Sequence, residues 1–165
     1  MIRRVLFVLV MFSGSGVGAQ APTFAYSDAQ LRWNEVECHV DRGLVRRGHD
    51  WRGEVIYSVR GELIFNGFSG NSFDLFYALR DGKLCLGDSN FTDAISYSIF
   101  ENRIYVGDSS FPMDLAYTIR VDRMNQGVLC VYKGDSISPF DVVAYFQGEP
   151  THTEIFALLL TMELL

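Results

Sequence analysis

The sequence predicts an all-β protein in which an antiparallel meander of about eight to ten strands closes as a barrel or folds as a sandwich. Three observations predict this fold: an internal repeat of about twenty residues, alternation of apolar and polar residues within each repeat, and turn residues between the alternating stretches. A short helix is expected after the last strand.

The repeat is visible when the chain is compared with itself at a shift of twenty residues. This shift aligns Gly67, Gly87 and Gly107, and a further copy follows a short insertion with Gly134. The same shift aligns four tyrosines, Tyr57, Tyr77, Tyr97 and Tyr117. Self-similarity of this kind identifies the supersecondary unit, and we place the repeat region at about residues 52–147.

Each repeat contains a short and a longer alternating stretch, as at residues 84–86 and 94–99. Alternation with β-branched and aromatic residues is typical of strands. Asp81-Gly82 and the recurring Gly-Asp-Ser triplets supply turn residues at the two ends of the unit. One repeat is therefore predicted to be one β-hairpin.

The C-terminal segment departs from this pattern. Thr151 and Glu154 have the spacing of a capping box, and an apolar run at residues 155–160 follows them. We expect a helix over residues 152–165 that is apolar nearly all round and too short to span a membrane. Such a helix would plug or cover the sheet, or dock on a partner.

The first nineteen residues have the order of a secretory signal peptide: Arg3 and Arg4, an apolar run, and small residues ending at Ala19. Cleavage there would leave residues 20–165 as a single β-rich domain, secreted or periplasmic. The alternative is a membrane anchor, for which the apolar run is short. Asn90 begins a glycosylation sequon that matters only in a eukaryotic host.

The charge of the chain narrows the class of partner. Without Arg3 and Arg4 the domain has 12 basic and 20 acidic residues, a net charge of −8, which disfavours binding to nucleic acid or anionic lipid. Residues 41–54 run against this trend, because four arginines stand there beside His49 and Trp51. This segment is either a basic patch for a phosphate, a lipid headgroup or an acidic partner, or a solvated loop.

The cysteines suggest one disulfide. Cys38 and Cys130 are the expected pair, because closing a meander brings its first strand beside its last ones, whereas Cys85 would stay free. No C-x-x-C element is present and the histidines are scattered, so we expect no zinc site, no other metal site and no cofactor.

The Gly-Asp-Ser triplet occurs three times, beginning at Gly87, Gly107 and Gly134. A strand followed by this triplet resembles the nucleophile block of the GDSL (SGNH) esterases, which implies a serine nucleophile assisted by a histidine. The resemblance covers three residues, and the Asp-x-x-His block of those enzymes has no match, because Glu149 stands three places before His152. Its repetition in register also favours a turn over a single nucleophile.

In a meander every second turn lies at the same end of the sheet. The turn residues Asp88, Asp108 and Asp135 are therefore expected to share one rim with Phe68, Phe91 and Phe111. The two interpretations of this rim are plain turn chemistry and a binding surface for a cation, a sugar or a basic loop.

The four repeat tyrosines lie between aliphatic residues on one strand face, which we take as the core face. They either pack in the core or line a cavity for a small apolar or glycan ligand.

No family resemblance extends across the chain. The function expected from the sequence is that of an exported, non-enzymatic β-domain that binds a protein or glycan partner through its acidic and aromatic rim. A carrier with a tyrosine-lined cavity is the alternative, and a hydrolase using one Gly-Asp-Ser serine is a third hypothesis. A deep tyrosine-lined pocket would favour the carrier, and a filled barrel with an exposed aromatic rim would favour the partner-binding module.

Overall fold

The computed structural model describes residues 20–89 and 91–165, so the predicted signal peptide and Asn90 lie outside the described residues. Twelve antiparallel strands form a closed barrel in which each strand pairs with its neighbours along the chain, and β1 closes the ring against β12 through Ala25 and Phe146. The strands are β1 (Thr23–Tyr26), β2 (Val36–Asp41), β3 (Leu44–Arg47), β4 (Val55–Arg60), β5 (Leu63–Asn66), β6 (Leu75–Arg80), β7 (Lys83–Leu86), β8 (Ile95–Phe100), β9 (Arg103–Val106), β10 (Leu115–Val121), β11 (Val128–Lys133) and β12 (Val142–Gln147).

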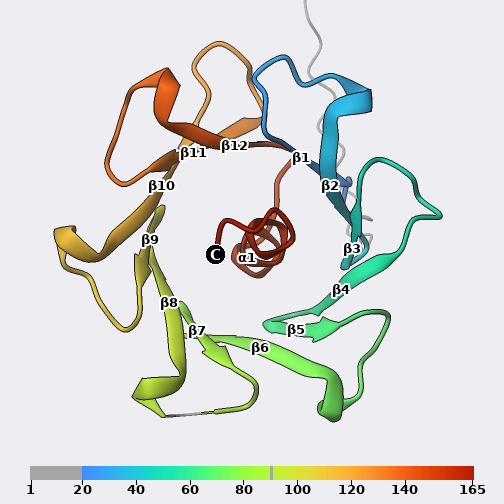
Figure 1. Ribbon diagram of the computed structural model, residues 1–165, viewed down its shortest axis with the longest axis vertical. Helices are drawn as coiled ribbons and strands as arrows, with labels where there is room; N and C mark the ends of the chain where they lie inside the picture. Colours follow the sequence, from blue (N-terminus) through green and yellow to red (C-terminus); the bar gives the residue numbers. More distant parts are fainter. Residues whose placement is uncertain (1–19, 90) are drawn as a thin grey trace, which may run out of the picture.

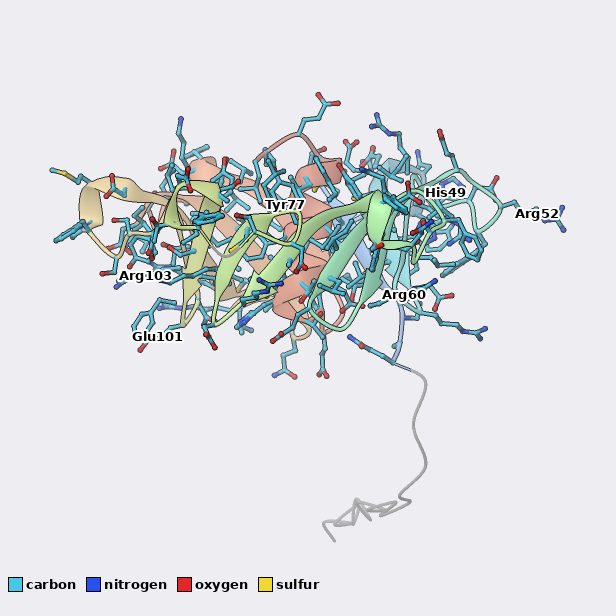
Figure 2. The ribbon with its side chains drawn as sticks, turned by 90° about the horizontal axis from the view of Figure 1, so that it is seen from below. His49, Arg52, Arg60, Tyr77, Glu101 and Arg103 are labelled. Atoms are coloured by element: carbon cyan, nitrogen blue, oxygen red, sulfur yellow. The ribbon has the colours of Figure 1, made fainter. Side chains whose placement is uncertain are left out.

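The predicted all-β meander of hairpin repeats is confirmed, and the closed form is a barrel. The strand number exceeds the expected eight to ten, partly because β1 lies before the repeat region. The strands make six hairpins, five of consecutive strands from β2 to β11 and a sixth of β12 with β1. Longer loops join one hairpin to the next and lie around the outside of the ring, so that the molecule is a flat disc (Figures 1 and 2).

Helix α1 (His152–Thr161) runs through the centre of the ring (Figure 1). Its predicted capping box is present, because Glu154 N–H donates to the Thr151 hydroxyl while Thr151 N–H donates to the Glu154 carboxylate. Phe156, Leu158 and Leu159 are fully buried. Since strands surround the helix, it is apolar on all sides, and each large side chain removed from water stabilises the fold by about 1.5–3 kcal/mol.

The strand residues that meet α1 follow the alternation seen in the sequence. The first strands of the hairpins contribute Val40, Leu79, Ile99, Ile119 and Phe146 to the core, and the second strands contribute Val45, Ile64, Leu84, Ile104 and Val131. Successive hairpins are also locked through their backbones. For example, Ile99 N–H donates to Gly82 O of the preceding hairpin turn at 2.6 Å, and Val59 N–H donates to Gly43 O at 2.6 Å.

Candidate functional site

The loops on the outside of the ring share one construction. The repeat glycines Gly67, Gly87, Gly107 and Gly134 all have φ between +56° and +67°. Each donates its N–H back to the first strand of its own hairpin at 2.7–2.8 Å, as Gly87 does to Phe76 O. A left-handed residue is needed there to reverse the chain, which explains why glycine recurs at this position.

The aspartates of the triplets make ion pairs with basic side chains. Asp88 pairs with Arg80, Asp108 pairs with Lys83 of the preceding hairpin at 2.8 Å, and Asp135 pairs with Arg120 at 3.0 Å and Arg103 at 3.5 Å. These pairs are partly open to solvent, with 37–76% of the aspartate side chains exposed. The acidic part of the rim is therefore locally neutralised by cations of the same ring.

The loop serines donate hydrogen bonds to an aspartate five residues later, and we call each such bond a Ser–Asp clamp. The hydroxyl of Ser109 donates to Asp114 at 2.5 Å, and the hydroxyl of Ser136 donates to Asp141 at 2.5 Å. Ser69 makes the same bond to Asp74 at 2.6 Å. Each hydroxyl also accepts the backbone N–H two residues later. The loop between β7 and β8 differs. There the Ser89 hydroxyl accepts from Phe91 N–H at 3.2 Å, and Ala94 stands where the other loops have the aspartate.

These contacts bear on the hydrolase hypothesis. The hydroxyls of Ser109 and Ser136 meet a carboxylate rather than an imidazole, and the described histidines lie elsewhere, on β2, in the loop after β3 and on α1. The arrangement is that of a turn that holds its own loop. Acyl transfer by a serine–histidine pair would require an imidazole at that place, and Asp114 and Asp141 stand there instead.

The outer loops carry apolar side chains that are exposed to solvent. Phe68, Phe91 and Phe111, predicted for the rim, are 77%, 76% and 69% exposed. We define the apolar rim as these three residues together with Phe73, Met113, Ile137 and Phe140. Exposed apolar side chains that gather in one patch mark interaction surfaces, and these loops supply such side chains around the outside of the ring.

Sequence reasoning missed Phe73, Met113 and Phe140, which are 91–95% exposed. A signal for them existed, because each stands six residues after a loop glycine and directly before the clamped aspartate. Each also lies in a 3-10 helix, at Ser72–Asp74, Pro112–Asp114 and Pro139–Asp141. The Ser–Asp hydrogen bond thus fixes the turn that presents the apolar side chain.

The four repeat tyrosines lie inside the ring and pack against the core around α1. The Tyr117 hydroxyl donates to Leu164 O at 2.6 Å, and burial raises the pKa values of Tyr57 and Tyr117. The space that a tyrosine-lined cavity would need is occupied by α1, whose core side chains are fully buried. One surface hollow among the described residues lies beside Asp122 and Tyr132, away from the repeat tyrosines.

The expected Cys38–Cys130 disulfide is absent, and all three cysteines are free thiols. Strands β1 and β12 lie between β2 and β11, so the two cysteines are three strands apart, about 14 Å at the usual strand spacing. They also face opposite ways. Cys38 belongs to the core cluster and its thiol lies 3.9 Å from Leu158 O, whereas Leu129 and Val131 on either side of Cys130 are the residues that face the core.

Among the described residues, no group of three or more histidine, cysteine, aspartate or glutamate side chains is arranged to hold a metal ion. Within the same residues, no helix has the length and apolar character needed to cross a membrane.

Comparison with known proteins gives one family match. A family model described as "6-fold beta flower protein" matches residues 26–130. No curated protein matches the chain. A protein from Arabidopsis thaliana with an X-ray structure is 14% identical, with 87% of this chain and 90% of that chain covered and a TM-score of 0.31. At that TM-score the pairing carries no argument about fold or function.

Proposed function

The chain belongs to the 6-fold β-flower family, whose model matches residues 26–130, and we propose that it is an exported, non-enzymatic scaffold that binds a macromolecular partner through its outer loops. The observation that carries the proposal is the apolar rim. Its side chains are largely exposed although the same chain buries a complete core elsewhere. We place the partner, a protein or a glycan, in the cell envelope or outside the cell.

The Ser–Asp clamps support a binding role for the rim. A loop that served only to connect two strands would need no fixed apolar tip, and exposing such a tip to water is unfavourable. Three loops nevertheless hold a Phe or Met beside a clamped aspartate. Rigid presentation lowers the conformational entropy lost when a partner binds.

Because the rim aspartates are already in ion pairs, we assign the contact with the partner to the apolar side chains rather than to the carboxylates. Asp88, Asp108 and Asp135 each have a basic neighbour within the ring, so a cationic partner would compete with those neighbours. Apolar side chains supply the contact, and the paired charges form a polar surrounding. This combination is common in protein interfaces.

The carrier hypothesis finds no supporting observation, because α1 fills the ring that a ligand would enter. The hydrolase hypothesis likewise gains none, since Ser109 and Ser136 donate to aspartates and Ser89 accepts a backbone N–H.

The test is affinity capture from host extract with three forms of the protein. The rim variant carries Phe73→Ser, Met113→Ser and Phe140→Ser, and the control carries Glu62→Ser and Asn102→Ser at exposed hairpin turns on another part of the surface. We expect the rim variant to stay folded and to lose partners that the wild type and the control capture. Equal capture by all three forms would reject the rim.

The acidic part of the rim is tested in the same experiment. A variant with Asp88→Asn, Asp108→Asn and Asp135→Asn keeps the turn-capping oxygens and removes three charges. Retained capture by this variant would assign binding to the apolar side chains, and lost capture would assign it to the carboxylates.

A further inference from the structure

One sector of the ring departs from the repeat. At the fourth position of three long strands, β4, β8 and β10, Ser58, Ser98 and Thr118 donate a hydroxyl to the carbonyl of the glycine that opens the following loop, at 2.6–2.9 Å, whereas β6 has Ala78 there. His39 occupies this position on β2 and makes the equivalent contact from Nδ1 to Gly48 O at 2.6 Å. Because a carbonyl oxygen only accepts, Nδ1 carries the proton.

The hydrogen bond to Gly48 O uses only one of the two ring nitrogens of His39. His39 is fully buried, and its Nε2 has no hydrogen-bond partner. A serine would have made the loop contact without leaving a second nitrogen unpaired. A buried polar atom without a partner is unfavourable, and in a native protein it calls for an explanation such as a ligand that completes it.

The unpaired nitrogen lies within a cluster of rings from two neighbouring loops. The His39 ring is 4.6 Å from Trp51, and Phe24 on β1 is 5.0 Å from Trp33 and 5.9 Å from Trp51. Trp33 in turn lies 5.4 Å from His49. Trp33 and Trp51 are 50% and 44% exposed, so the cluster opens to solvent on its outer side.

The charges of this sector also differ from those of the other loops. The position after the loop glycine holds an aspartate in three loops and Phe68 in a fourth, but His49 holds it here. Arg46, the register partner of His39 on β3, has a buried Nε without a hydrogen-bond partner. Neither Arg46 nor Arg47 nor Arg52 forms an ion pair within residues 20–89 and 91–165. Figure 2 shows Arg52 extending from this edge of the disc, with Arg103 on the other half.

We propose that the aromatic and basic sector formed by Phe24, Trp33, His39, Arg46, His49 and Trp51 is a binding site for an acidic sugar. The indole faces offer an apolar platform for the flat face of a sugar ring, and the guanidinium of Arg46 offers charge-assisted hydrogen bonds to a carboxylate or phosphate. A sugar hydroxyl can donate to the lone pair of His39 Nε2, which an acidic peptide side chain in its ionised form cannot do. Since Trp51 lies against the imidazole, its ring shifts when the hydroxyl reaches Nε2.

This site does not depend on the apolar rim, which lies on other loops, so the two can fail separately. Trp33 and Trp51 are the two tryptophans of the chain, and intrinsic tryptophan fluorescence therefore reports on this sector alone. The experiment titrates the purified protein with oligogalacturonate, with a neutral galactose oligomer of the same length, with a sugar phosphate and with polyglutamate.

Saturable change of tryptophan emission with oligogalacturonate or the sugar phosphate, and not with the neutral oligomer, is the expected result. The first two probes separate a carboxylate from a phosphate as the acid group. An equal response to polyglutamate would overturn the proposal in favour of an acidic peptide, and no saturable response to either acidic sugar would reject the site.

Variants test the assigned atoms. Arg46→Gln should raise Kd about tenfold or more, because a charge-assisted hydrogen bond is lost. His39→Ser introduces the residue that β4 and β8 have at this position, so it keeps the loop contact while removing Nε2, and it should also weaken binding. Arg103→Gln removes an ion-paired arginine on the other half of the disc and should leave Kd unchanged. Unchanged affinity in both sector variants would overturn the proposal.

Discussion

Replacing Phe156 by alanine tests the claim that the ring is a filled barrel. Phe156 lies on α1 and is fully buried, so truncation removes a large apolar side chain and leaves a cavity. Changes of this kind cost about 3–5 kcal/mol. For a domain of this length, that cost corresponds to a fall in Tm of roughly 6–20 °C.

The matched control is Phe140→Ala, which makes the same chemical change at a side chain that is 95% exposed. Its effect on the free energy of unfolding should stay within about 0.5 kcal/mol. Urea unfolding followed by circular dichroism measures both. Similar costs for the two variants, or a larger cost at Phe140, would refute a core built around α1.

Three further predictions concern the hairpin turns, the ion pairs and the thiols. Gly82→Ala should lower the free energy of unfolding by at least about 1 kcal/mol more than Gly61→Ala. Both glycines have positive φ, but a Cβ at Gly82 would lie 2.5 Å from Ile99 O, whereas Gly61 faces open space. Equal losses in urea unfolding would contradict the close hairpin contact. Asp135→Asn should change the free energy of unfolding by no more than about 1 kcal/mol, less at high salt, since its ion pairs are partly exposed; a larger, salt-independent loss would show that they are structural. Burial raises the pKa of Cys38 from 9.0 to about 12, so this thiol stabilises the fold below pH 9 and that contribution is lost as the pH rises toward 12. Cys38→Ala should therefore flatten the fall in the free energy of unfolding between pH 9 and pH 12. An unchanged pH dependence would contradict a raised pKa for this thiol.

The repeat made most of the fold predictable. Alternation places Tyr77 and Leu79 on one face of a strand, and the structure packs both residues toward α1. The loop glycines were predictable for a similar reason, because a left-handed residue is required at each chain reversal. The helix followed from its capping box and apolar run.

The parts that failed depend on contacts distant in the sequence. Strand β1 has four residues and lies outside the repeat, so the sequence pattern predicts the strand that carries Cys38 as the first one. That shift put Cys38 beside the last strands and produced the wrong disulfide. The ion pair of Asp108 was also hidden, because its partner Lys83 comes from another hairpin, 25 residues earlier.

The exposed apolar tips were missed because they lie in 3-10 turns, where no alternation of strand residues marks a face. Met113 and Phe140 follow a proline in these turns, and their exposure is set by the loop path rather than by local propensity.

Site-specific photo-crosslinking tests the central claim, that the outer loops are the binding surface of this scaffold, most directly. A photoreactive residue is placed at Phe73, Met113 or Phe140 and, as controls, at Glu62 or Asn102, and the protein is irradiated in host extract. If the outer loops bind the partner, discrete crosslinked products form from the three rim positions and none from the control positions. Crosslinking from the control positions alone, or equally from both sets, would contradict it.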